Sequence, residues 1–158
     1  MANRDDEHQA RAPICQVSDC KLAVDIALQS SDGKLFGSHM ANLEAFNAGF
    51  PSTNNVTHQE GDIVRLSEDG KTLELLLRFS HNIEYSEISE IGLDTVLSLA
   101  KAADKYGNAF PSRACIEAVN ILVKESPSNA LLAFPYKMMR SDFRNIDEIV
   151  QSTITPSR

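Results

Sequence analysis

The stretch DIALQSSDGKLFGSH, residues 25–39, decides the fold of this chain. Apolar side chains alternate with smaller or polar ones from Leu22 to Leu28, which is the period-two pattern of a half-buried strand. The Asp32-Gly33 pair that follows is a strong hairpin signal, because glycine adopts a positive φ at little cost. Residues 34–37 then form the returning strand. The stretch therefore predicts a β-hairpin near the start of the domain.

A helix follows the hairpin directly. Ser38 can cap this helix, and Gly49 with Pro51 should end it. Its apolar residues recur every three positions, at Met40, Leu43 and Phe46. His39 sits at the junction of strand and helix. It could act as a base or a pH switch, but we expect a structural role in which its ring nitrogens bond nearby backbone and fix the entry into the helix.

The rest of the chain is mainly helical. Residues 63–66 read as a short strand, residues 71–81 as a buried helix, and residues 83–85 as a short strand within a connecting segment. Later helices are indicated by residues 93–106 with Gly107 as a C-cap, by Pro111, by Ser126-Pro127, and by residues 142–154. Pro135 is expected to kink or break the helix that begins at Ser126-Pro127. On the face of residues 93–103 we expect Leu93, Val96, Leu97, Ala100 and Ala103 to be buried. This order predicts an α+β domain with a small sheet at one end.

Composition excludes several classes of function. The chain has 158 residues, which suits one domain, and a net charge of −7, which argues against a nucleic-acid binder. No apolar run approaches the length of a membrane span. The polar, acidic start is not a secretory signal, and three cysteines fit a reduced compartment. We therefore expect an intracellular protein, cytoplasmic or nuclear, that contacts neither nucleic acid nor membrane.

Residues with reactive side chains give no clear site. Structural zinc sites usually pair ligands roughly two to four residues apart, twice over. Cys15 and Cys20 make one such pair, whereas the histidines are scattered and Cys115 lies far along the chain. We therefore expect no metal and no cofactor. Cys115 falls on the apolar face of a helix, where a thiol is inert, and we expect it to be a core residue. No catalytic residue is assigned, and the chain is expected not to be an enzyme.

Taken together, these motifs resemble a BTB/POZ domain. The resemblance covers residues 21–124 and is closest to members from mushroom-forming fungi. Three later segments, residues 64–66, 73–79 and 97–106, match the family's next strand and helices. The signature residues of the resemblance are Asp25, Asp32, Gly33, Phe36, His39, Leu43 and Phe50. Where the family commonly has serine, eight residues after the histidine, this chain has Asn47.

The resemblance implies a fold and a domain organisation. It predicts a BTB/POZ domain at residues 21–124, with a mostly antiparallel three-stranded sheet packed on a helical cluster. A disordered or weakly ordered segment should precede it at residues 1–20. A C-terminal extension at residues 125–158 should carry a further helix pair, as often follows the domain in fungal proteins.

The resemblance also implies a function. BTB/POZ domains are non-catalytic modules that bind proteins, by forming homodimers or by recruiting a partner. Corepressor-binding members have a buried aspartate, matched by Asp25, and a basic residue where this chain has Met40. The alternative is an adaptor or scaffold subunit of a cullin-type ubiquitin ligase, including a role like that of the subunit that carries F-box proteins. From their positions in loops we expect partner contacts at Phe50, Pro51, Glu60, Asp62 and Tyr85.

Overall fold

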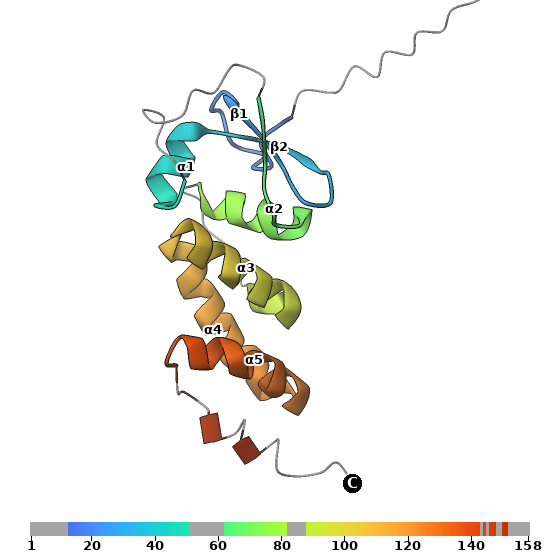
Figure 1. The fold of residues 1–158 in the computed structure, drawn as a ribbon, viewed down its shortest axis with the longest axis vertical. Coiled ribbons are helices and arrows are strands. Elements are labelled where there is room, and N and C mark those ends of the chain that lie inside the picture. Colours follow the sequence, from blue (N-terminus) through green and yellow to red (C-terminus); the bar gives the residue numbers. More distant parts are fainter. Residues whose placement is uncertain are drawn as a thin grey trace, which may run out of the picture.

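The computed structural model confirms an α+β fold. It describes residues 13–50, 62–81 and 88–142, together with residues 144, 146, 147, 150 and 151. A small sheet and α1 (Met40–Phe46) lie at one end, and the other helices are stacked along the long axis towards the C-terminal end (Figure 1). The remaining helices are α2 (Gly70–Phe79), the 3-10 helix η2 (Ile88–Glu90), α3 (Leu93–Tyr106), α4 (Ala109–Glu125) and α5 (Pro127–Met139). No helix in these ranges is long and apolar enough to span a membrane.

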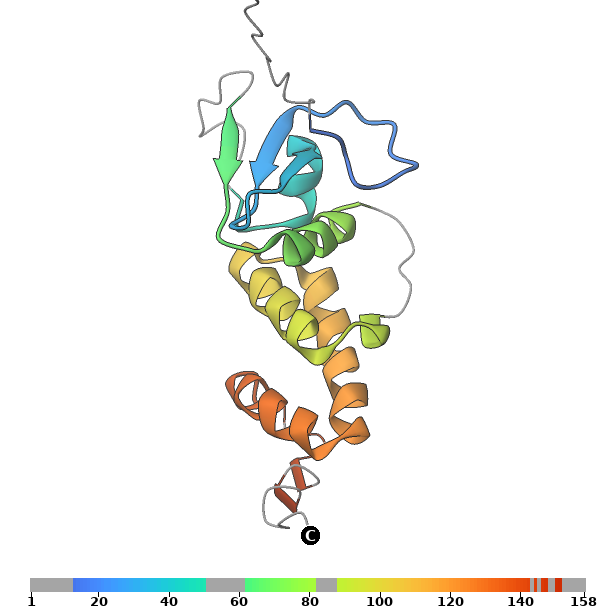
Figure 2. The same ribbon diagram turned by 90° about the vertical axis from the view of Figure 1, so that its right-hand side faces the viewer.

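The sheet has three strands, β1 (Ile26–Gln29), β2 (Leu35–Ser38) and β3 (Ile63–Arg65). β1 is central, antiparallel to β2 and parallel to β3 (Figure 2). The hairpin prediction is confirmed, and Gly33 in its turn has a φ of 84°. The expectation of a mostly antiparallel sheet is wrong. Because the chain passes through α1 before β3, it returns to pair with β1 in the same direction, as a crossover connection allows.

The first strand is shorter than the alternating pattern predicted. Leu22 and Val24 lie outside β1 and are exposed, with 55% of the Leu22 surface accessible. The last residue pair of the hairpin is Ile26 with Ser38, because β2 ends there and the chain turns into α1. The Asp25 amide still donates to the Ser38 carbonyl, but Leu22 and Val24 lie beyond the end of β2 and lack an antiparallel partner there.

The helix boundaries follow local signals in most places. Gly107 is left-handed, with φ 65°, and ends α3 as predicted. Ser126 caps α5 by accepting a hydrogen bond from the Asn129 amide, which is confirmed as well. α1 differs, because its N-cap is His39 instead of Ser38 and it ends at Phe46. The strand expected at residues 83–85 lies outside the described residues, as does most of the helix expected at 142–154.

α5 runs through Pro135, so the proline, which we expected to kink or break this helix, does not break it. Proline removes one backbone hydrogen bond from a helix interior. Here α5 is held by the packing of its buried residues Ala130, Ala133 and Lys137, and α4 is its main packing partner. This packing outweighs the local cost of the proline.

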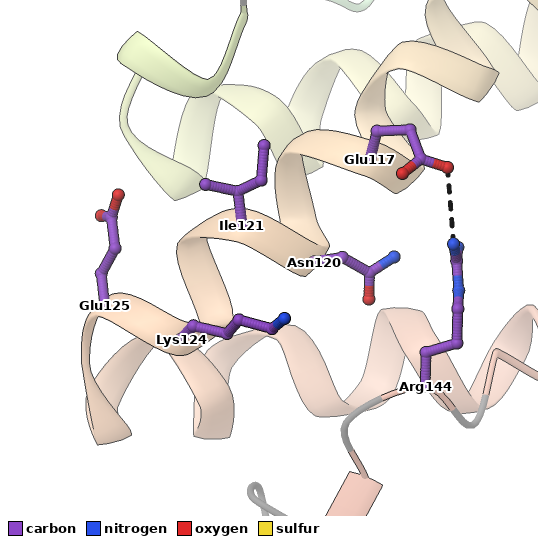
Figure 3. Close-up of a pocket in the computed structure, with 6 residues that line it drawn as sticks. All are labelled: Glu117, Asn120, Ile121, Lys124, Glu125 and Arg144. Atoms are coloured by element: carbon purple, nitrogen blue, oxygen red, sulfur yellow. Dashed lines mark hydrogen bonds and ion pairs between the residues drawn. The ribbon is translucent and has the colours of Figure 1, made fainter.

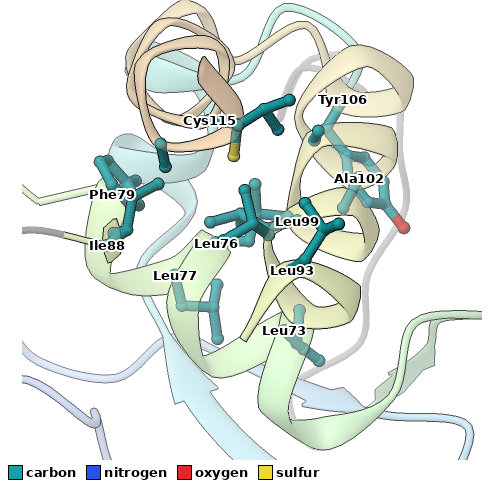
Figure 4. Packing of buried hydrophobic residues seen from close by; sticks show 14 of the residues in the cluster. Leu73, Leu76, Leu77, Phe79, Ile88, Leu93, Leu99, Ala102, Tyr106 and Cys115 are labelled. Atoms are coloured by element: carbon teal, nitrogen blue, oxygen red, sulfur yellow. The ribbon is translucent and has the colours of Figure 1, made fainter. Parts of the chain in front are cut away.

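The core lies between α2, α3 and α4. Leu73 and Leu76 from α2, Leu99 from α3 and Cys115 from α4 are completely buried and meet there (Figure 4). Leu97, which we expected in the core, is only partly buried. The reason is that α3 packs against both α2 and α4. Its buried face is therefore wider than one apolar stripe and is centred closer to Leu99 than to Leu97.

Candidate functional site: a cysteine–histidine cluster and an apolar helix face

His39 is fixed at the start of α1 by two contacts. The residue is 98% buried, and Nδ1 of its ring lies 2.7 Å from the carbonyl oxygen of Ala23. Because a carbonyl only accepts, Nδ1 carries the proton and donates this hydrogen bond. The expected structural role of His39 is therefore confirmed for one ring nitrogen. The other nitrogen, Nε2, faces the sulfur of Cys20 at 3.2 Å.

His81 repeats this arrangement at the other end of the site. It follows directly after α2, and its Nδ1 donates to the carbonyl of Leu77 at 2.8 Å. Its Nε2 lies 3.3 Å from the sulfur of Cys15. The two imidazoles are perpendicular neighbours, with ring centroids 5.4 Å apart and planes at 77°.

Four side chains therefore converge, namely Cys15, Cys20, His39 and His81. One ligand atom from each lies within 4.8 Å of all the others, the histidines buried and the cysteines half-buried. Burial raises the pKa of the Cys15 thiol, and the neighbouring Cys20 raises it further. Sulfur and imidazole nitrogen together form a ligand set suited to a soft divalent metal. The sequence showed only the cysteine pair, because the fold alone brings the two histidines together.

The segment that carries the cysteines lies against the edge of β2. Cys15 forms a parallel bridge with Gly37, and the Gly37 amide donates to the carbonyl of Ile14 at 2.9 Å. A Cβ atom at Gly37 would lie 2.6 Å from the carbonyl oxygen of Pro13. The backbone of Pro13 and Ile14 can therefore lie this close to β2 only because residue 37 is a glycine. These residues belong to the segment 1–20 that we expected to be disordered or weakly ordered.

The signature residues hold the hairpin and the helices together. Phe36 and Leu43 are buried in the core. Asp32 lies in the hairpin turn with Gly33, and its carboxylate accepts hydrogen bonds from the Ser30 hydroxyl and the Gly70 amide. The bond from Ser30 is the main reason why the pKa of Asp32 is lowered.

Asp25 does not occupy the environment implied by the resemblance. The corepressor-binding pattern requires a buried aspartate, whereas Asp25 is exposed. Its carboxylate accepts a hydrogen bond from the Met40 amide at 2.8 Å, at the first turn of α1. Asp25 therefore stabilises a helix N-terminus here.

Of the residues expected to contact a partner, Phe50 and Asp62 lie in the described part of the chain. Phe50 is half-buried and stacks on Tyr106, with ring centroids 4.6 Å apart. Asp62 is exposed. Pro51, Glu60 and Tyr85 lie outside the described residues.

α5 presents an apolar face to solvent that sequence reasoning missed. The exposed side chains include Leu131 at 59% and Met139 at 83% of their surface. The spacing along α5 places Leu131 and Met139 away from its buried residues Ala130, Ala133 and Lys137. The exposed apolar residues of this face are Leu131, Leu132, Phe134, Met138 and Met139. The signal that could have found it is an apolar content of α5 too high for one buried stripe.

A pocket lies on α4, close to Arg144 (Figure 3). Its charged side chains have both signs, and Arg144 pairs with Glu117 at 3.4 Å. The lining residues are Glu117, Asn120, Ile121, Lys124, Glu125 and Arg144. Glutamate, lysine and arginine on an exposed helix face are ordinary solvated groups, so this pocket does not suggest a reaction.

Comparison with known proteins assigns no family, because no family model matches the sequence and no curated protein matches it. The resemblance to BTB/POZ domains therefore remains a prediction.

Proposed function

We propose that this chain is a non-catalytic protein–protein interaction module of the BTB/POZ type. The observation that carries the proposal is the apolar outer face of α5, formed by Leu131, Leu132, Phe134, Met138 and Met139. Large apolar side chains exposed together along one helix are more than the single scattered ones usual on a protein surface, and such groups mark surfaces that bind another protein. The order of the hairpin, α1, β3 and the later helices also agrees with the resemblance.

The energetics favour an interface on α5. Full burial of one large apolar side chain contributes roughly 1.5–3 kcal/mol relative to leaving it in water. The opposite side of α5 is already used, because Ala130, Ala133 and Lys137 are buried. The outer face is thus the part of α5 that gains from a partner, and the flexible side chains of Met138 and Met139 can adapt to a protein surface.

A non-catalytic role agrees with the environment of the thiol in the core. Cys115 is completely buried, and this burial raises its pKa to about 12. Such a thiol remains protonated at neutral pH and is a poor nucleophile. Its position supports packing as its role, as expected from the sequence.

Sedimentation velocity over a range of concentrations tests the proposal with three proteins. They are the wild type, the double variant Leu131→Glu/Met138→Glu, and the control Ser128→Glu, which places a charge on an exposed polar position of α5. We expect the wild type and the control to self-associate, or to retain a common set of partners in pull-downs, and the double variant to lose this. Monomeric behaviour and identical partners in all three would contradict the proposal.

Titration calorimetry with the N-terminal domain of a fungal cullin distinguishes a role as ligase adaptor from a role as self-associating scaffold. Micromolar or tighter binding would make the module a ligase adaptor. The absence of heat, with a dimeric mass, would make it a self-associating scaffold.

A further inference from the structure

We propose that Cys15, Cys20, His39 and His81 bind one Zn²⁺ ion as a tetrahedral structural site. A tetrahedron with ordinary zinc–sulfur and zinc–nitrogen bonds has ligand–ligand distances of about 3.3–3.8 Å. The two sulfur–nitrogen distances are 3.2 and 3.3 Å, and all four ligand atoms lie within 4.8 Å of one another. Shifts smaller than the length of a bond would thus complete the coordination shell.

The histidine tautomers are set for metal binding. Both Nδ1 atoms donate to backbone carbonyls, those of Ala23 and Leu77. Both Nε2 atoms therefore carry a free electron pair, and both face a cysteine sulfur. Backbone acceptors that orient metal-binding imidazoles in this way are typical of zinc sites. The arrangement occurs twice, on two separate elements.

The charge balance favours zinc over hard cations. Two thiolates and one Zn²⁺ give a neutral group, which suits a site whose imidazoles are buried. Magnesium and calcium prefer oxygen ligands, which this cluster does not offer. Four protein ligands also leave no open position for water, so the site is structural.

Zinc would join three separate segments of the fold. Cys15 and Cys20 belong to the segment beside β2, His39 begins α1, and His81 follows α2. In the described part of the chain, the backbone of residues 13–24 also contacts β2 at Gly37 and accepts a hydrogen bond from the His39 ring at Ala23. Metal binding would therefore contribute to folding, as it does in small zinc domains.

Metal content of the purified full chain tests the site. We expect one zinc per chain by elemental analysis in the wild type and in Cys115→Ala, which removes the third thiol outside the cluster. We expect Cys20→Ser and His81→Ala to lose it. Chelation should lower the melting temperature of the wild type and leave that of Cys20→Ser unchanged. Wild-type protein without stoichiometric metal, or with a Cys15–Cys20 disulfide under reducing conditions, would overturn the proposal.

Cobalt substitution gives a spectroscopic readout that does not depend on a variant losing its metal. Co²⁺ in the wild type should show the visible bands of a tetrahedral ion and a sulfur-to-metal charge-transfer band in the near ultraviolet. His81→Cys should keep one metal per chain and show a stronger charge-transfer band, because it adds a third thiolate. An unchanged band in His81→Cys would show that His81 is not a ligand and would overturn the assignment.

Discussion

The side chains of Asn47 and Asn108 are hydrogen-bonded to each other in the interior, with the Asn108 amide nitrogen 3.0 Å from the Asn47 carbonyl oxygen. Both residues are 99% buried. The Asn47 amide also donates to the Leu43 carbonyl and to the Ser80 hydroxyl. One side chain thereby links the end of α1, the end of α2 and the start of α4.

Asn47→Ala should lower the free energy of unfolding by about 1–3 kcal/mol, because it leaves the buried Asn108 amide without its acceptor. Chemical denaturation measures the change. Asn42→Ala, on a partly exposed position of α1, is the control and should have little effect. Equal losses in the two variants would mean that the buried network contributes nothing specific.

Leu99→Ala should cost about 2–5 kcal/mol, because Leu99 is completely buried and its truncation leaves a cavity in the core. Leu97→Ala, on the same helix but only partly buried, should cost clearly less. Both values come from the same denaturation experiment. A larger loss for Leu97→Ala would show that the packing of α3 differs from the one described.

Gly37→Ala should destabilise the protein and weaken metal retention, because the new methyl group would lie 2.6 Å from the Pro13 carbonyl oxygen. This displaces the segment that carries Cys15. The control is Gly92→Ala, since a Cβ there meets no atom within 4 Å and the backbone has a negative φ. Thermal melting and zinc analysis follow both variants. A neutral Gly37→Ala would mean that residues 13–15 do not pack against β2.

Asp142 should make the free energy of unfolding depend on pH in the acidic range. Hydrogen bonds from the Arg144 guanidinium hold the pKa of Asp142 well below its usual range, and the buried Lys137 ammonium lies 3.4 Å away. A carboxylate with a lowered folded-state pKa stabilises fully above its unfolded value, near pH 4, and this contribution is lost as the pH falls below it. We therefore expect unfolding free energy to decrease from about pH 4 downwards.

Asp142→Asn should reduce stability at neutral pH and flatten this acid dependence, as measured by urea denaturation at several pH values. Glu125→Gln, at the exposed last residue of α4, should change neither. If Asp142→Asn retains the wild-type slope, other carboxylates cause the acid loss.

The sequence predicted the elements whose signals are local. The Asp32-Gly33 turn, the left-handed Gly107 and the Ser126-Pro127 start of α5 each depend on a few adjacent residues, and the structure has all three. Where a local signal opposed packing, packing prevailed. Pro135 does not end α5, because the buried side of that helix holds it in place.

Only the tertiary structure decided which distant residues meet. The parallel pairing of β3, the contact of Asn47 with Asn108 and the cluster of Cys15, Cys20, His39 and His81 all join separate segments. The sequence alone shows that these side chains are able to form hydrogen bonds or to coordinate a metal ion. Whether they do so depends on which segments the packing of the core brings together. The spacing of neighbouring residues in the sequence does not indicate this.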